Sequence, residues 1–173
     1  MITIRFATIT DADLIADMSR QTFYETFAVS NTKANMDIFM NKTFTKEALM
    51  NEVGTPGNIF FLAYDGDEPV GYVRIHQSAN PPELVNANAI EIARIYATTN
   101  AIGKGVGKIL MQQCIAIAME KKKDTIWLGV WEHNQRAINF YSKWGFEKFG
   151  THVFILGEDA QTDWLMKKSL TSF

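Results

Sequence analysis

The first part of the chain changes from the period of a strand to the period of a helix. Residues 2–6 alternate between apolar and polar side chains, which predicts a half-buried strand. The apolar positions that follow have helical spacing, and Thr10 is expected to cap this helix by accepting a hydrogen bond from a first-turn amide. Asp13 would then lie at the positive end of the helix dipole. Residues 31–52 predict one or two short helices, with Thr45 as a cap.

The middle of the chain returns to the shorter period of strands. The apolar runs 59–64 and 70–75 flank Asp65-Gly66-Asp67, a sequence typical of a tight turn, and together they predict a hairpin. The segment from Ala79 to Asn88 contains two consecutive prolines and is expected to form a loop. Residues 89–97 alternate again, as expected of a further strand.

Helices and strands interleave in the rest of the chain. Apolar residues from Val106 to Ile117 predict a helix, and the apolar run 125–131 predicts a strand covered on both faces. A stripe from Ala137 to Trp144 predicts another helix, and two strands are expected around 149–156 and 163–166. This order predicts an α/β fold in which helices cover both faces of one sheet.

Composition adds the scale of the fold and removes several classes of protein. A chain of 173 residues, 47% hydrophobic and 21% charged, is expected to form one domain over residues 1–173, since no linker or repeat divides it. A net charge of −2 argues against a nucleic-acid partner. Cys114 is the single cysteine, so we expect neither a disulfide nor a cysteine-rich metal site. No run reaches the roughly 18 apolar residues of a membrane span, and the first residues lack a secretion signal, so we expect a cytoplasmic protein without a membrane partner.

A glycine-rich segment between a strand and a helix is the sharpest local signal. It reads Ile102-Gly103-Lys104-Gly105-Val106-Gly107-Lys108. Alternating glycines let the backbone approach a ligand, and the following helix N-terminus adds positive partial charge, which suits a pyrophosphate. The spacing matches neither the P-loop nor the dinucleotide-binding motif. An anion site and a flexible turn both remain open.

A second segment follows one helix and one strand later. It reads Trp131-Glu132-His133-Asn134-Gln135-Arg136-Ala137-Ile138-Asn139-Phe140-Tyr141, and Gly145-Phe146 come shortly after. The pattern N-x-x-A-x-x-x-Y-x-x-x-G-F behind a glycine loop resembles the GNAT superfamily of acetyl-CoA-dependent N-acetyltransferases. The segments 22–27, 94–96, 126–132 and 161–163 are similar to PaiA-type spermidine/spermine N-acetyltransferases. The resemblance implies a twisted, mixed, mostly antiparallel sheet whose strands 4 and 5 splay apart.

The resemblance also implies roles for individual residues. The loop 102–108 would hold the pyrophosphate through its amides, although its first position is normally Arg or Gln and here is Ile102. The backbone of Ile95, Tyr96 and Ala97 would pair with the pantetheine arm, and an N–H there would polarise the thioester carbonyl. Asn134 would bond the pantetheine arm, and the Tyr141 hydroxyl would protonate the departing thiolate. Lys143 is a candidate for the adenosine phosphate of coenzyme A.

The general base is the position at which the resemblance fails. Many relatives carry a glutamate where this chain has Ala93. Strand alternation would put residues 91, 93 and 95 on one face, so Glu91 is expected to take the amine's proton through water. A solvated or ion-paired carboxylate at the strand end is the alternative for Glu91.

Residues that would contact the acceptor complete the predicted site. Glu25 is the preferred carboxylate for binding a polyamine, and Trp131 is expected at the edge of the gap between the splayed strands 4 and 5. The other acidic candidates are Asp37, Glu83, Glu132 and Asp163. The three histidines are expected to be surface or hydrogen-bonded groups, with no metal, and Cys114 to be a packed thiol.

Together these features predict an enzyme that moves an acetyl group from acetyl-CoA to a primary amine by direct attack in a ternary complex. Spermidine or spermine is the preferred acceptor. The alternatives are another amine (an antibiotic, an amino acid or a protein N-terminus) and a non-catalytic regulator that binds acyl-CoA. A homodimer is a further expectation, taken from the resemblance.

Overall fold

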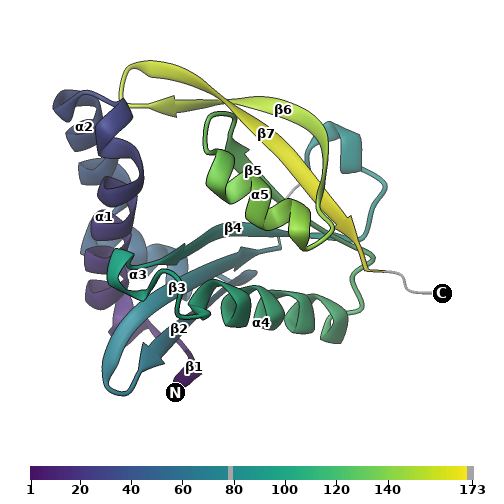
Figure 1. Cartoon of the computed structure of the whole chain (residues 1–173), viewed down its shortest axis with the longest axis horizontal. Helices are drawn as coiled ribbons and strands as arrows, with labels where there is room; N and C mark the ends of the chain where they lie inside the picture. The colour runs from purple at the N-terminus through teal and green to yellow at the C-terminus, as the bar shows by residue number, and fades with distance from the viewer. Residues whose placement is uncertain (78–79, 171–173) are drawn as a thin grey trace.

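The computed structural model describes residues 1–77 and 80–170, and the strands within them form one sheet (Figure 1). The order across this seven-stranded sheet is β1-β2-β3-β4-β5-β7-β6. All neighbouring pairs are antiparallel except β4 and β5, which are parallel. The strands are β1 (Ile2–Phe6), β2 (Asn58–Asp65), β3 (Glu68–His76), β4 (Ala89–Ala97), β5 (Thr125–Trp131), β6 (Glu147–Leu156) and β7 (Asp159–Ser169).

Helices cover both faces of the sheet, as the interleaved pattern predicts. One face carries α4 (Val106–Glu120) and α5 (Gln135–Lys143), whose apolar residues share a core with β2 to β5. The other face carries α1 (Ala12–Phe27), α2 (Lys33–Thr43) and α3 (Lys46–Gly54) around a second core (Figure 1). In the described part of the chain, no helix is long and apolar enough to cross a membrane. The mixed α/β architecture is thus confirmed.

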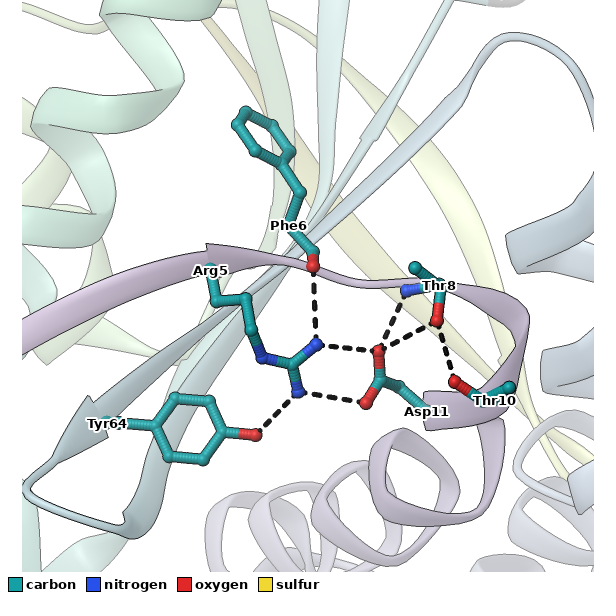
Figure 2. Close-up of polar contacts among 6 residues, drawn as sticks. All are labelled: Arg5, Phe6, Thr8, Thr10, Asp11 and Tyr64. Carbon is teal, nitrogen blue, oxygen red and sulfur yellow. Dashed lines mark hydrogen bonds and ion pairs between the residues drawn. The ribbon is translucent and has the colours of Figure 1, made fainter.

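The entry into α1 differs from its prediction. A short 3-10 helix, Ile9–Asp11, begins after Thr8, and α1 follows at Ala12. The carboxylate of Asp11 accepts the Thr8 amide at 2.8 Å and two guanidinium hydrogen bonds from Arg5, at 3.0 and 2.9 Å (Figure 2). The hydroxyl of Thr10 pairs with that of Thr8 instead of capping α1. The predicted cap was therefore wrong, because Asp11 organises this turn with an arginine from β1.

The other connections agree better with the sequence. Asp65-Gly66-Asp67 joins β2 to β3 as a hairpin turn, and the Thr45 hydroxyl accepts the Ala48 amide at the start of α3. The loop predicted from Ala79 onward contains a short 3-10 helix, Pro82–Leu84, while Ala79 itself lies outside the described residues.

Strands β4 and β5 separate after a short stretch of pairing. Three residue pairs join them, of which the last is Glu91 with Trp127. Beyond that point β5 pairs with β7 on its other side, and β4 with β3. The sheet is therefore split along its middle, and the predicted splaying of strands 4 and 5 is confirmed.

A β-bulge at Ala93 bends β4 at the start of the split. The register against β3 shifts there, because Arg74 is opposite Arg94 whereas Ile75 is opposite Ile92. The extra residue reverses which side chains face each core. Ile92 and Ile95, three residues apart, consequently pack on the same side of the sheet. Strand alternation does not hold across this position.

Candidate active site

A cavity of about 620 Å³ occupies the split between β4 and β5. Its walls begin where the pairing of the two strands ends, with Ile92–Ala97 on one side and Leu128–Trp131 on the other. Its volume is in the range of small-molecule and cofactor sites. The split in the sheet thus creates the hollow in which a ligand would lie.

The edge of β4 that faces this cavity has no strand beside it. Backbone N–H and C=O groups on such an edge are available to an extended ligand, in the way that a peptide adds to a sheet. The predicted residues Ile95, Tyr96 and Ala97 all lie on this wall. The ring of Tyr96 stacks on that of Tyr72, with centroids 5.9 Å apart, and fixes this part of the strand.

The glycine loop forms one end of the cavity, directly before α4. Gly103 and Gly105 have φ angles of +85° and +81°, a conformation that other residues rarely adopt. A Cβ at either position would meet no protein atom within 4 Å, so the space above them is open to a ligand. The lining residues from the predicted segment are Ile102, Gly103, Gly105, Val106, Gly107 and Lys108. Lys104 does not line the cavity.

Helix α5 and its N-cap residue bring two predicted residues to the cavity wall. The Asn134 side-chain oxygen accepts the Ala137 amide at 3.2 Å and so caps the helix, which leaves its N–H donors for a ligand. Tyr141 follows about two helical turns later, also lines the cavity and is 8% exposed. Burial raises the pKa of the Tyr141 phenol, so this hydroxyl keeps its proton at neutral pH. A group that is to donate a proton needs this property.

Arg136 is a cavity residue that the sequence analysis passed over. It lies in the first turn of α5, beside Ala137 and Phe140, and all three line the cavity. Its guanidinium adds a second cationic donor to the cavity lining, besides Lys108 of the glycine loop. Both cations suit an anionic ligand. Arg136 belongs to the segment 131–141, so its positive charge was the feature of the sequence that could have indicated a contact with an anionic ligand.

Glu91 does not lie where strand alternation predicted. The bulge at Ala93 puts it on the face of Arg94 and Tyr96, so the expected common face for residues 91, 93 and 95 was wrong. Glu91 is the last paired residue before the split and does not line the cavity. Its carboxylate lies 3.9 Å from the His76 ring, and burial raises its pKa.

Asp163 is the carboxylate that the fold does bring into the cavity. It lies on β7 opposite Trp131, and its Oδ2 is 3.3 Å from Nε2 of His152 on β6. This contact raises the pKa of His152. Among the described lining residues, no other side chain carries a carboxylate. Asp163 is one of the acidic candidates predicted from the sequence, among which Glu25 is the preferred residue.

A cluster of aromatic side chains forms part of the cavity wall. Phe23 and Phe39 stack with centroids 4.5 Å apart, and Phe154 meets Phe39 edge-on at 5.3 Å. Phe27 continues the ring cluster to Trp131 at 6.0 Å. All five rings line the cavity. They come from helices and strands far apart in the sequence, so no local pattern predicts the cluster.

Other predicted residues lie outside the cavity lining. The carboxylate of Glu25 accepts the Thr99 amide at 3.2 Å and a Gln21 hydrogen bond at 3.0 Å. Lys143 is exposed in the last turn of α5, and Asp37 pairs with Lys33. The thiol of Cys114 is fully buried in the α4 core, as predicted.

The three histidines lie beside carboxylates, and His152 makes a hydrogen bond to one of them. His76 faces Glu91, the His133 ring is 3.5 Å from Glu132, and His152 contacts Asp163. The side chain of Trp127, on β5, is buried, whereas that of Trp131 lines the cavity.

Comparison with known proteins identifies the family. The sequence model of the acetyltransferase (GNAT) family matches residues 18–146, which is most of the chain. The chain belongs to the GNAT family of acetyltransferases. This acetyltransferase is 39% identical over 173 residues to an uncharacterized N-acetyltransferase of Lactobacillus delbrueckii subsp. lactis, with 98% of this chain and 99% of the relative covered.

Two further relatives come from Thermoplasma acidophilum. A spermidine N(1)-acetyltransferase is 26% identical, over 84% of this chain and 88% of its own. The crystal structure of the PaiA N-acetyltransferase in complex with coenzyme A superposes with a TM-score of 0.81 and 23% identity, covering 98% of this chain and 99% of that one. At this identity the superposition supports the shared fold. This acetyltransferase therefore has the GNAT fold and is an N-acetyltransferase by family.

The cavity has the features that a coenzyme A thioester requires. The open space above Gly103 and Gly105, at the N-terminus of α4, suits a diphosphate, with Lys108 as an added cation. The unpaired β4 edge, from Ile95 to Ala97, suits an extended amide-containing arm. The residues present therefore fit the group that the family uses.

Proposed function

We propose that this acetyltransferase transfers an acetyl group from acetyl-CoA to a primary amine held in the same cavity. The observation that carries the proposal is the meeting of the glycine loop with the unpaired edge of β4 in one hollow. Holding both reactants there would turn a bimolecular step into an effectively unimolecular one. Acetyl-CoA supplies the acetyl group, activated as a thioester.

The residues of the chain would take the roles that their positions suggest. A backbone N–H of Tyr96 or Ala97 would donate to the carbonyl oxygen as negative charge develops on it. The Tyr141 hydroxyl, which keeps its proton at neutral pH, would donate that proton to the departing sulfur. The free amide of Asn134 would hold the pantetheine arm, and the loop from Ile102 to Lys108 would hold the diphosphate. Lys104 and Lys143, exposed beside these segments, would meet phosphate groups from outside the cavity.

Spermidine and spermine are the acceptors we propose first. The support is the likeness to a relative named spermidine N(1)-acetyltransferase. A cytoplasmic site of action agrees with the use of acetyl-CoA and with a single cysteine that is fully buried.

An amine on an apolar or aromatic body is the second candidate acceptor. The specific observation in its favour is the ring cluster of Phe23, Phe27, Phe39, Phe154 and Trp131 in the cavity wall. Aromatic faces bind both apolar bodies and cations. A polyamine would place its methylene chain and one cation there, but would find a single carboxylate, Asp163, among the described lining residues.

Thiol release from acetyl-CoA in the presence of an amine panel tests the proposal. The panel would contain spermidine, spermine, propylamine, 2-phenylethylamine, an aminoglycoside, an amino acid and a peptide with a free N-terminus. Release that depends on an amine, with the acetylated product found by mass spectrometry, would support the proposed function. Saturable binding of coenzyme A without release from any amine would contradict it.

A further inference from the structure

A carboxylate of β7 lies in the cavity, where the reaction needs a proton acceptor. The glutamate position of many relatives is Ala93, which lines the cavity but carries no ionisable group. Glu91 lies outside the lining, at the closed end of the split. Asp163 remains as the carboxylate among the described lining residues, and its side chain is 14% exposed.

Three neighbours define where the Asp163 carboxylate points. Its Oδ2 lies 3.3 Å from Nε2 of His152, which fixes the carboxylate from the β6 side. Gly129 on β5 has no side chain there, and a Cβ would lie 3.5 Å from both Asp163 Oδ2 and His152 Nε2. On the cavity side, Asp163 and Tyr96 both line the hollow, with Tyr96 on the β4 wall. The carboxylate is therefore held from the β6 side and lines the cavity.

We propose that Asp163 accepts the proton of the acceptor amine and that His152 is the residue that positions it. This inference rests on the proposed function, because it names the base of that reaction. It accounts for an N-acetyltransferase without an acidic residue at position 93, since the fold supplies the carboxylate from the neighbouring half of the sheet.

The step balances in protons and bonds. The acceptor enters as an ammonium ion and gives one proton to the Asp163 carboxylate, which frees the nitrogen lone pair. The nitrogen then forms a bond to the thioester carbon, and the carbon–sulfur bond breaks. The nitrogen loses a second proton as the sulfur gains one, and the proton held by Asp163 passes to water. The net products are the amide, the free thiol and one proton.

His152 also couples this site to pH. Two carboxylates interact with it, Asp163 from β7 and Glu91 from β4, and the Asp163 contact raises its pKa. While His152 is cationic, its contact with Asp163 Oδ2 is an ion pair, and that oxygen is less available to accept the proton of the amine. The rate should therefore rise as His152 loses its proton, in addition to any rise from the amine itself.

A pair of acceptors with different basicity tests the role of Asp163. We would use the fastest amine of the panel and its analogue with two fluorine atoms on the carbon beta to nitrogen, which is far less basic. Asp163→Asn should lower kcat/KM about 100-fold for the parent amine and less than about 10-fold for the fluorinated one, which needs no base. Equal losses for both amines, or no loss, would overturn the inference.

A second variant keeps the test independent of folding and binding. His152→Gln should lower kcat/KM less than Asp163→Asn does and should remove the acid-side inflection of its pH profile; an unchanged inflection would contradict the positioning role. Asp67→Asn, in the β2–β3 turn and outside the cavity lining, loses the same charge and should leave kcat/KM unchanged. Coenzyme A affinity should be equal in all variants. An active wild type with a fully active Asp163→Asn variant would contradict this inference alone, whereas a wild type inactive on every amine would contradict the proposed function as well.

Discussion

The pairing of Glu91 with Trp127 is the last between β4 and β5, and the cavity begins at the next residue of each strand. Glu91 therefore marks the closed end of the split and does not reach its interior. Trp127 is 6% exposed and packs beneath the sheet with Leu165. The pair fixes where the two strands separate.

Glu91→Gln should accordingly leave kcat within about five-fold of the wild type. The side chain does not line the cavity, and burial raises the pKa of its carboxyl, so the charged form is unfavourable in the folded protein. Removing this charge should not lower the free energy of unfolding at neutral pH. Steady-state rates and thermal melts measure both effects. A loss of 100-fold in kcat would assign the base role to Glu91 after all.

Tyr141→Phe should lower kcat by roughly 100-fold if its hydroxyl protonates the departing sulfur. KM for acetyl-CoA should change little, because the ring and its packing in the cavity wall are retained. Tyr24→Phe removes a hydroxyl from an exposed tyrosine of α1 and serves as the control. Stopped-flow or steady-state thiol release gives kcat, and an unchanged value would remove Tyr141 from the mechanism.

Gly105→Asp should abolish coenzyme A binding. The position has φ of +81° and open space above it, so a carboxylate there would point at the diphosphate. Gly105→Asn has nearly the same shape and the same tolerance of this backbone conformation, but carries no charge. Calorimetric titration should find weaker binding for Asn and none for Asp. Equal affinities for both variants would mean that the diphosphate lies elsewhere.

The turn before α1 gives a prediction about stability. Asp11→Asn should lower the free energy of unfolding by about 1 kcal/mol at neutral pH, because it weakens the contacts with Arg5 and with the Thr8 amide. The effect is kept small because Arg5 is half-exposed and solvent screens its charge. The Arg5 guanidinium lowers the pKa of Asp11. The ionised Asp11 carboxylate therefore adds its full contribution to the free energy of unfolding above the pKa of about 3.9 that it has in the unfolded chain. This contribution is lost as the pH falls through the lower pKa of the folded protein.

Urea unfolding of both proteins across this pH range measures the difference. Asp17→Asn, at an exposed position of α1, is the matched control and should have little effect at any pH. A difference between Asp11→Asn and the wild type that stays constant down to strongly acidic pH would contradict the ionic origin of this contribution.

The sequence predicted those parts of the site that lie in one continuous segment. The glycine loop before α4 and the segment from Asn134 to Tyr141 each carry their signal locally, in glycine spacing and in a helix start, and both segments supply cavity walls. The α/β class followed from the alternation of periods. The splayed strands came from the family resemblance, because no local pattern encodes the end of a strand pairing.

The rest depended on register and on long-range contacts. The prediction for Glu91 assumed that side chains alternate regularly along β4. The bulge at Ala93 interrupts this alternation, so Glu91 lies on the other face of the sheet. Asp163 and His152 meet because β6 pairs with β7 in one register, and the sequence alone does not fix that register. The Thr10 cap failed for a similar reason, since the carboxylate that organises the turn is held by Arg5 from β1.

A crystal structure of the protein with coenzyme A tests the central claim most directly. The account predicts the diphosphate over the amides of residues 103–108 and the pantetheine arm along the open edge of β4, with the sulfur between Ala97 and Tyr141. Coenzyme A bound outside the split, or β4 and β5 paired beyond Glu91 and Trp127 so that no hollow remains, would contradict it.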